Sequence, residues 1–115
     1  MSNLKIKIKN HDVPVSWENM SAVGAIMNKL SSVKKFQMTK NGIRHIGNIG
    51  IPVPRNDRAF NARPGDIAIQ DGNLVIFSGE DDVSCTKLGK ISGYSETQIK
   101  SLLSSGSINV ELYEG

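Results

Sequence analysis

The feature that most constrains the fold is a dipeptide, Asp71-Gly72, that lies between two short apolar runs. Asp and Gly both tolerate the positive φ angles of a two-residue β-hairpin turn, so this dipeptide is a strong local signal. The flanking residues, 66–70 and 73–78, are therefore expected to be paired strands. This hairpin predicts an antiparallel sheet in the middle of the chain.

Alternation of apolar and polar residues predicts further strands at both ends of the chain. Residues 4–9 alternate aliphatic side chains with lysines, and residues 108–112 alternate aliphatic with other polar side chains. A period of two gives a strand one buried face and one solvated face. Turn-forming residues at 10–12 separate the first run from residues 13–17, so we expect an N-terminal hairpin.

Two helices are predicted among these strands. Asn19 or Ser21 can cap the first, which has an apolar stripe that ends at Leu30. The second begins at the capping box Ser95–Gln98 and ends before Gly106. Further strands are expected over residues 33–39, 43–51 and 88–92.

These elements predict a mainly β fold of about eight strands and two short α-helices. Hairpins dominate, so the sheet is expected to be antiparallel, and a closed barrel best removes its exposed edges. The 115 residues fit a single domain that spans positions 1–115.

Composition argues against several classes of protein. The net charge of +3 is too small to indicate nucleic-acid binding by itself. The single cysteine, Cys85, rules out an intramolecular disulfide and a Cys-based zinc site. No run is long enough to cross a membrane, so a cytoplasmic location is the default expectation. We expect no metal site and no cofactor, because no ligand spacing or phosphate-binding loop is visible.

The arginines gather in one part of the chain. All four lie within a 20-residue stretch: Arg44, Arg55, Arg58 and Arg63. The last part of this stretch overlaps the irregular segment 52–64, which contains three of the prolines. Guanidinium groups suit carboxylate and phosphate, and long irregular loops are often functional. We therefore predict a groove on the side of the barrel, rimmed by Arg44, Arg55 and Arg63, with His45 as a further ligand contact.

The order of several short motifs resembles the small bacterial cyclophilin-like family. These motifs are Pro64–Ala68, Asn73–Phe77 and Leu88–Ile91, followed by a closing helix and strand. The resemblance covers most of the chain. It implies an eight-stranded cyclophilin-like barrel capped by two helices.

The same resemblance suggests roles for individual residues. True cyclophilins are prolyl isomerases, and Arg55 and Phe60 stand at the spacing of their catalytic arginine and pocket phenylalanine. Arg63 takes the place of a glutamine, and Phe77 falls near a second pocket phenylalanine. The usual tryptophan and histidine are missing from residues 80–85.

These observations leave several functions open. The preferred one is a domain that binds a peptide or a small anionic molecule and lacks the full isomerase machinery. Its ligand-binding residues would be Arg44, His45, Arg55, Phe60, Arg63 and Phe77. The alternative is a weak peptidyl-prolyl isomerase with Arg55 as its catalytic residue. Nucleic-acid binding is less favoured, a membrane partner is not expected, and a homo-oligomer stays open.

Overall fold

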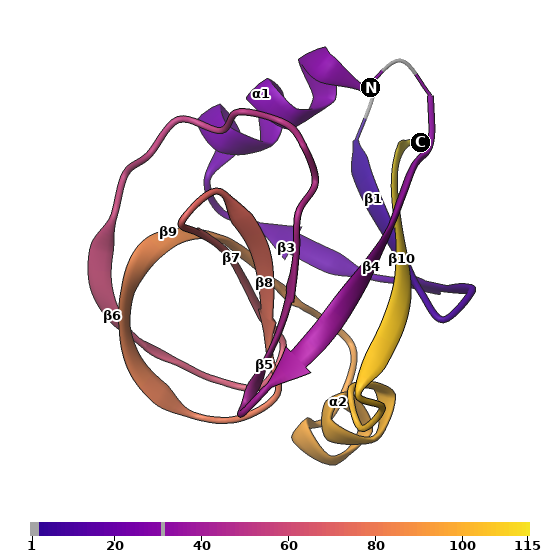
Figure 1. Cartoon of the computed structure of the whole chain (residues 1–115), viewed down its shortest axis with the longest axis vertical. Helices are drawn as coiled ribbons and strands as arrows, with labels where there is room; N and C mark the ends of the chain where they lie inside the picture. Colours follow the sequence, from indigo (N-terminus) through magenta and orange to yellow (C-terminus); the bar gives the residue numbers. More distant parts are fainter. Residues whose placement is uncertain (1–2, 31) are drawn as a thin grey trace.

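The computed structural model describes residues 3–30 and 32–115, which form ten strands and two helices (Figure 1). In chain order the elements are β1 (Leu4–Ile8), β2 (His11–Val13), β3 (Val15–Trp17), α1 (Met20–Lys29), β4 (Lys34–Asn41), β5 (Arg44–Gly47), β6 (Arg58–Ala62), β7 (Asp66–Gln70), β8 (Asn73–Phe77), β9 (Asp81–Ile91), α2 (Glu96–Leu102) and β10 (Ser107–Glu114).

Nine strands form one antiparallel path in the order β2-β1-β10-β4-β5-β8-β7-β9-β3, and β6 pairs with β9 outside this path. The structure therefore confirms the predicted mainly β, antiparallel barrel with two helices. It has more strands than the eight expected, because Pro14 divides one N-terminal strand into two and because β6 adds a strand.

The barrel is nearly closed by one continuous stretch of chain that changes its partner at Pro14. β2 pairs with β1, whereas β3 pairs with β9, so the two ends of the path are covalently joined. The Pro14 carbonyl accepts a hydrogen bond from the Ser92 N–H at 2.9 Å. Trp17 donates its indole Nε1–H to the Leu4 carbonyl at 2.7 Å, which ties β3 to β1 across the junction.

Strands β7 and β8 are buried on both faces. Ile67, Ile69, Leu74 and Ile76 contribute to the main core inside the barrel. Their neighbours on the opposite face belong to a second, smaller core, which is Ala62, Ala68, Val75, Phe77, Val83 and Cys85. The second core lies under the curved ribbon of β6 and β9, at the left of Figure 1.

The two helices pack against the main core from opposite sides of the molecule in Figure 1. Asn19 caps α1, because its side chain accepts a hydrogen bond from the Ala22 N–H at 3.1 Å. The predicted capping box of α2 is confirmed, with Ser95 and Gln98 bonded to each other's backbone. No helix in the described parts of the chain is long and apolar enough to cross a membrane.

Two expected boundaries were wrong in the middle of the chain. Residues 52–64 were predicted to be one irregular loop, yet β6 lies within them and pairs with residues 81–85. β9 begins at Asp81 rather than at Leu88, because its first residues pair with β6. The ribbon covers the second core, and this tertiary contact outweighs the local turn signals.

The strand contact beside Gly89 yields a test of the fold. A Cβ at this position would overlap the Ser16 carbonyl oxygen and lie 2.9 Å from the Trp17 Cα, both of them backbone atoms. We expect Gly89→Ala to lower the free energy of unfolding by about 1–3 kcal/mol, because the β3 backbone cannot yield without breaking its ladder.

Gly24→Ala is the matched control for this substitution. Gly24 lies inside α1, and a Cβ there has nothing within 4 Å. We expect this variant to be about 0.5–1 kcal/mol more stable, since alanine favours a helix interior over glycine. Urea unfolding measures the free energy of unfolding of both variants. Equal changes in the two variants would contradict the close β3–β9 contact.

Candidate functional site

Arg44 and Phe77 are brought together by the pairing of β5 with β8. The guanidinium carbon lies 5.6 Å from the centre of the Phe77 ring. Its Nη1 donates to the Gln70 Oε1 at 2.7 Å, and its Nη2 lies 3.5 Å from the Asp81 carboxylate. Phe77 itself is fully buried in the second core. Arg44 therefore covers this core and already has a carboxylate partner.

His45 is a buried residue of β5 rather than an exposed one. Its side chain is inaccessible, and its Nε2 lies 2.7 Å from the Ser105 carbonyl oxygen. The other ring nitrogen, Nδ1, has no hydrogen-bond partner among the described residues. Burial lowers the pKa of His45 below its ordinary value of 6.5, and the nearby positive charges of Lys40 and Lys9 also lower it.

Arg55 lies on the loop that connects β5 to β6. Its guanidinium donates to the Asp57 carboxylate, and its side chain is 72% exposed. Asp57 also accepts a hydrogen bond from the buried Thr86 hydroxyl at 2.6 Å, and the Asn56 N–H donates to the same hydroxyl oxygen at 2.9 Å. The hydrogen bonds from Arg55 and Thr86 lower the pKa of Asp57. This network holds the end of the loop against β9.

Phe60 and Arg63 lie farther along the same segment. Phe60 is half-buried against the second core, and the Lys87 ammonium lies 5.5 Å from its ring centre. Arg63 is exposed and paired with Glu80 at 3.3 Å and with Glu96 at 3.2 Å.

The six predicted site residues therefore do not share one cavity. Arg55 lines a cavity of about 200 Å³ with Asp57 and Asp71, and Phe60 lines a separate hollow on the β6–β9 ribbon. Arg44, Arg55 and Arg63 each have a carboxylate partner. An anionic ligand would have to compete with these carboxylates, which is unfavourable for binding at the arginines.

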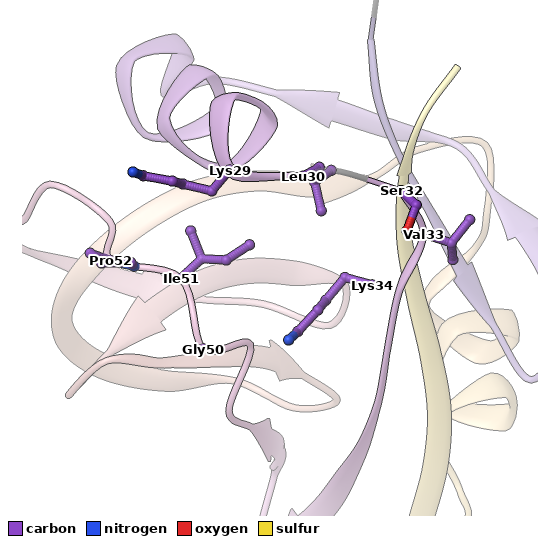
Figure 2. Close-up of a pocket in the computed structure, with 8 residues that line it drawn as sticks. All are labelled: Lys29, Leu30, Ser32, Val33, Lys34, Gly50, Ile51 and Pro52. Carbon is purple, nitrogen blue, oxygen red and sulfur yellow. The ribbon is translucent and has the colours of Figure 1, made fainter.

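A second cavity, of about 280 Å³, lies between the end of α1 and the loop that follows β5 (Figure 2). Its lining combines apolar residues with two lysines: Lys29, Leu30, Ser32, Val33, Lys34, Gly50, Ile51 and Pro52. Ile51 and Pro52 also line the Arg55 cavity, so this segment is the wall between the two.

Lys29 and Lys34 come from different elements and extend on either side of Ile51 in Figure 2. Lys29 is the last residue of α1, and Lys34 is the first residue of β4. Within residues 3–30 and 32–115, neither ammonium group lies within ion-pair distance of a carboxylate. The cavity thus carries two positive charges that no described acidic side chain neutralises.

The loop wall of this cavity is fixed at several points. Ile49 is fully buried in the main core, and the Asn48 side chain accepts a hydrogen bond from the Gly50 N–H at 2.7 Å. Gly50 has a φ of 67°, which favours glycine, and a Cβ there would lie 3.6 Å from the Lys34 Nζ. Because Asn56 is anchored on Thr86, the loop wall is held on both sides of residues 50–52.

Sequence reasoning missed Lys29 and Lys34 because the lysines are spread widely along the chain. Their only local signal is that they are close in sequence, at the end of α1 and the start of β4. The partner wall, residues 50–52, is brought to them by the fold. Elsewhere in the described residues, no group of three or more His, Cys, Asp or Glu side chains could hold a metal ion.

Comparison with known proteins identifies the family. The model of the Cyclophilin-like family matches residues 6–113. The chain belongs to this family. No curated protein shows significant sequence similarity to it.

Two solved structures share the fold of this cyclophilin-like chain. The structure of McbB in complex with tryptophan has a TM-score of 0.67 and 13% identity over 96% of the chain. The chain spans only 44% of McbB. The solution structure of the hypothetical protein AF2241 from Archaeoglobus fulgidus has a TM-score of 0.64 and 15% identity, and the match covers 98% of this chain and 93% of that one. Identities this low show a common fold only.

Burial of His45 predicts a specific pH dependence of stability. The unfolded chain binds a proton at this residue near pH 6.5, whereas the folded chain binds it only at lower pH. Stability from this group is therefore complete above pH 6.5 and falls as the pH drops below it, by up to about 1.4 kcal/mol per pH unit.

One variant tests this expectation. His45→Gln removes the titrating group, so its free energy of unfolding should change less between pH 6.5 and 5 than that of the parent chain. Urea unfolding at several pH values measures the two slopes, and identical slopes in the two proteins would contradict the assignment.

Proposed function

We propose that this cyclophilin-like domain binds a small amphipathic anion in the cavity between α1 and the loop after β5. The observation that carries the proposal is the pair of lysines, Lys29 and Lys34, in a cavity lining that also contains Leu30 and Ile51. A carboxylate or phosphate would accept hydrogen bonds from the lysines, and its hydrocarbon part would cover the apolar wall.

The size and charge of the cavity define the class of ligand. Its volume of about 280 Å³ is at the small end of the usual range for ligand pockets, which suits a molecule of metabolite size. Because the wall includes Val33, Ile51 and Pro52, a ligand with an apolar group gains more than a bare inorganic anion.

A free carboxylate beside an apolar group also occurs at the C-terminus of a peptide. The peptide ligand predicted from the sequence therefore offers the same chemistry at one of its ends. Tryptophan, the molecule in the McbB complex, has a carboxylate and an apolar ring as well. The titration described below compares N-acetyl-leucine, which resembles a peptide C-terminus, with tryptophan.

Prolyl isomerisation through Arg55 is the weaker proposal. A catalytic arginine has to point at the amide of a proline held in an aromatic pocket. Here the Arg55 guanidinium is bonded to Asp57, and Phe60 lines another hollow. We infer that a coupled prolyl-peptide assay would give a rate close to the uncatalysed one, and a rate abolished by Arg55→Ala would restore the isomerase proposal.

The binding proposal is tested by isothermal titration with hexanoate, 1-hexanol, N-acetyl-leucine and tryptophan. We expect the carboxylates to bind and hexanol, which lacks the charge, to bind at least about tenfold more weakly. Substituting both lysines, Lys29→Gln with Lys34→Gln, should weaken carboxylate binding by about ten- to a hundredfold, since each removes a charge-assisted hydrogen bond.

The matched control is Lys35→Gln with Lys40→Gln. Like Lys34, these two lysines lie on β4, but they are exposed and do not line the cavity. This variant loses the same net charge and should bind hexanoate like the parent chain. Equal loss of affinity in both double variants would indicate general attraction to a basic surface and would overturn the proposed site.

A further inference from the structure

The N-terminal strands leave a gap in the barrel wall where the chain changes its partner at Pro14. β1 pairs with β2 only over residues 6–8, and β3 pairs only with β9. The edges of β1 and β3 that face each other therefore have no strand between them in the described chain. We call this gap the seam; its lining comprises Asn3, Leu4, Lys5, Val13, Pro14, Val15, Trp17 and Met20, around about 440 Å³.

The backbone of β1 directs hydrogen-bonding groups into the seam. Asn3 and Gly115 exchange hydrogen bonds at 3.1 and 2.9 Å, so the N–H and C=O of Asn3 point toward β10. Successive residues of a strand direct these groups to opposite sides. The N–H and C=O of Leu4 therefore point away from β10 and into the seam.

The backbone of β3 also directs hydrogen-bonding groups into the seam, from the side opposite β1. Pro14 and Glu18 bond to β9, through Ser92 and Leu88 respectively. By the same alternation, the backbone groups of Ser16 point to β9, whereas those of Val15 and Trp17 point into the seam. Two strand edges whose main-chain donors and acceptors have no strand partner in the described chain thus face one cavity.

The Trp17 indole occupies the place of a strand donor in this cavity. Its Nε1–H donates to the Leu4 carbonyl at 2.7 Å, the bond that a main-chain N–H of a neighbouring strand would make. The surroundings include apolar side chains, with Val15 and Trp17 half-buried and Met20 61% exposed. Exposed methionine beside an open strand edge is a surface that suits another chain.

We propose that the seam binds an extended peptide segment, whose main-chain N–H replaces the Trp17 indole as the donor to the Leu4 carbonyl. The segment adds a strand between β1 and β3 and completes the barrel wall. Apolar side chains at alternate positions would contact Val13, Val15 and Met20, and an acidic residue would face Lys5. This site is separate from the Lys29–Lys34 cavity and does not depend on it.

The probe is a capped peptide, acetyl-Thr-Val-Glu-Val-Thr-Val-Glu-amide, added to the full chain. Trp17 is the only tryptophan, so its fluorescence reports on the seam alone. We expect saturable binding with a dissociation constant of about 1 mM or below, a change of Trp17 emission, and NMR shifts confined to the amides of Leu4, Val15 and Trp17 and the indole N–H. A peptide methylated on the valine nitrogens should bind at least about tenfold more weakly.

Two variants separate this proposal from a general hydrophobic contact. Val15→Pro removes a seam-facing N–H without touching the β9 ladder and should abolish binding. Ser16→Ala, whose N–H faces β9, should bind as the parent chain does. Absence of binding at several millimolar peptide, equal binding of the methylated peptide, or shifts outside the seam would overturn the proposal. Because hexanoate titration is independent of the seam, these results do not affect the anion site.

Discussion

The pairing of β3 with β9 depends on a single change of direction at Pro14, and the barrel depends on that pairing. A sheet of this size has edges that would otherwise be free to pair with other molecules. Here the two edge strands, β2 and β3, are consecutive in the chain, so closure requires no long connection. Proline has no N–H to give to a ladder, which makes it a suitable residue for the point where one ladder ends.

Closure also positions the loop that forms the wall of the proposed anion site. The main core inside the barrel anchors Ile49, and Thr86 on β9 holds Asn56, so the loop between β5 and β6 is fixed at both ends. That loop forms the wall of the cavity that contains Lys29 and Lys34. The second core under the β6–β9 ribbon covers the outer face of β7 and β8, which leaves the predicted arginines on the surface with acidic partners.

Much of the fold could be predicted because the local signals agree with the tertiary structure. Asp71-Gly72 forms the expected turn with positive φ at both residues, and Ser95 with Gln98 forms the expected capping box. β6 could not be predicted, because its stability comes from pairing with residues 81–85 and not from its own sequence. The candidate site was harder to predict for a similar reason: Lys29 and Lys34 become neighbours of Ile51 only through the folding of a distant loop.

The arginines show that residues close in sequence can have separate partners after folding. Their clustering along the chain is real, yet Arg44, Arg55 and Arg63 pair with carboxylates at three different places. Charge density along a sequence says little about which charges stay uncompensated after folding. The two cavity lysines are proposed to bind an anion because the fold leaves them without acidic partners among the described residues.

The most direct measurement of the central claim is a crystal structure of the chain soaked with 6-bromohexanoate, with anomalous scattering used to locate the bromine. The account predicts a bromine peak beside Leu30 and Ile51 and a carboxylate within hydrogen-bond distance of the Lys29 and Lys34 ammonium groups. A peak at the arginine loop or in the seam, with the lysine cavity empty at saturating ligand, would contradict it.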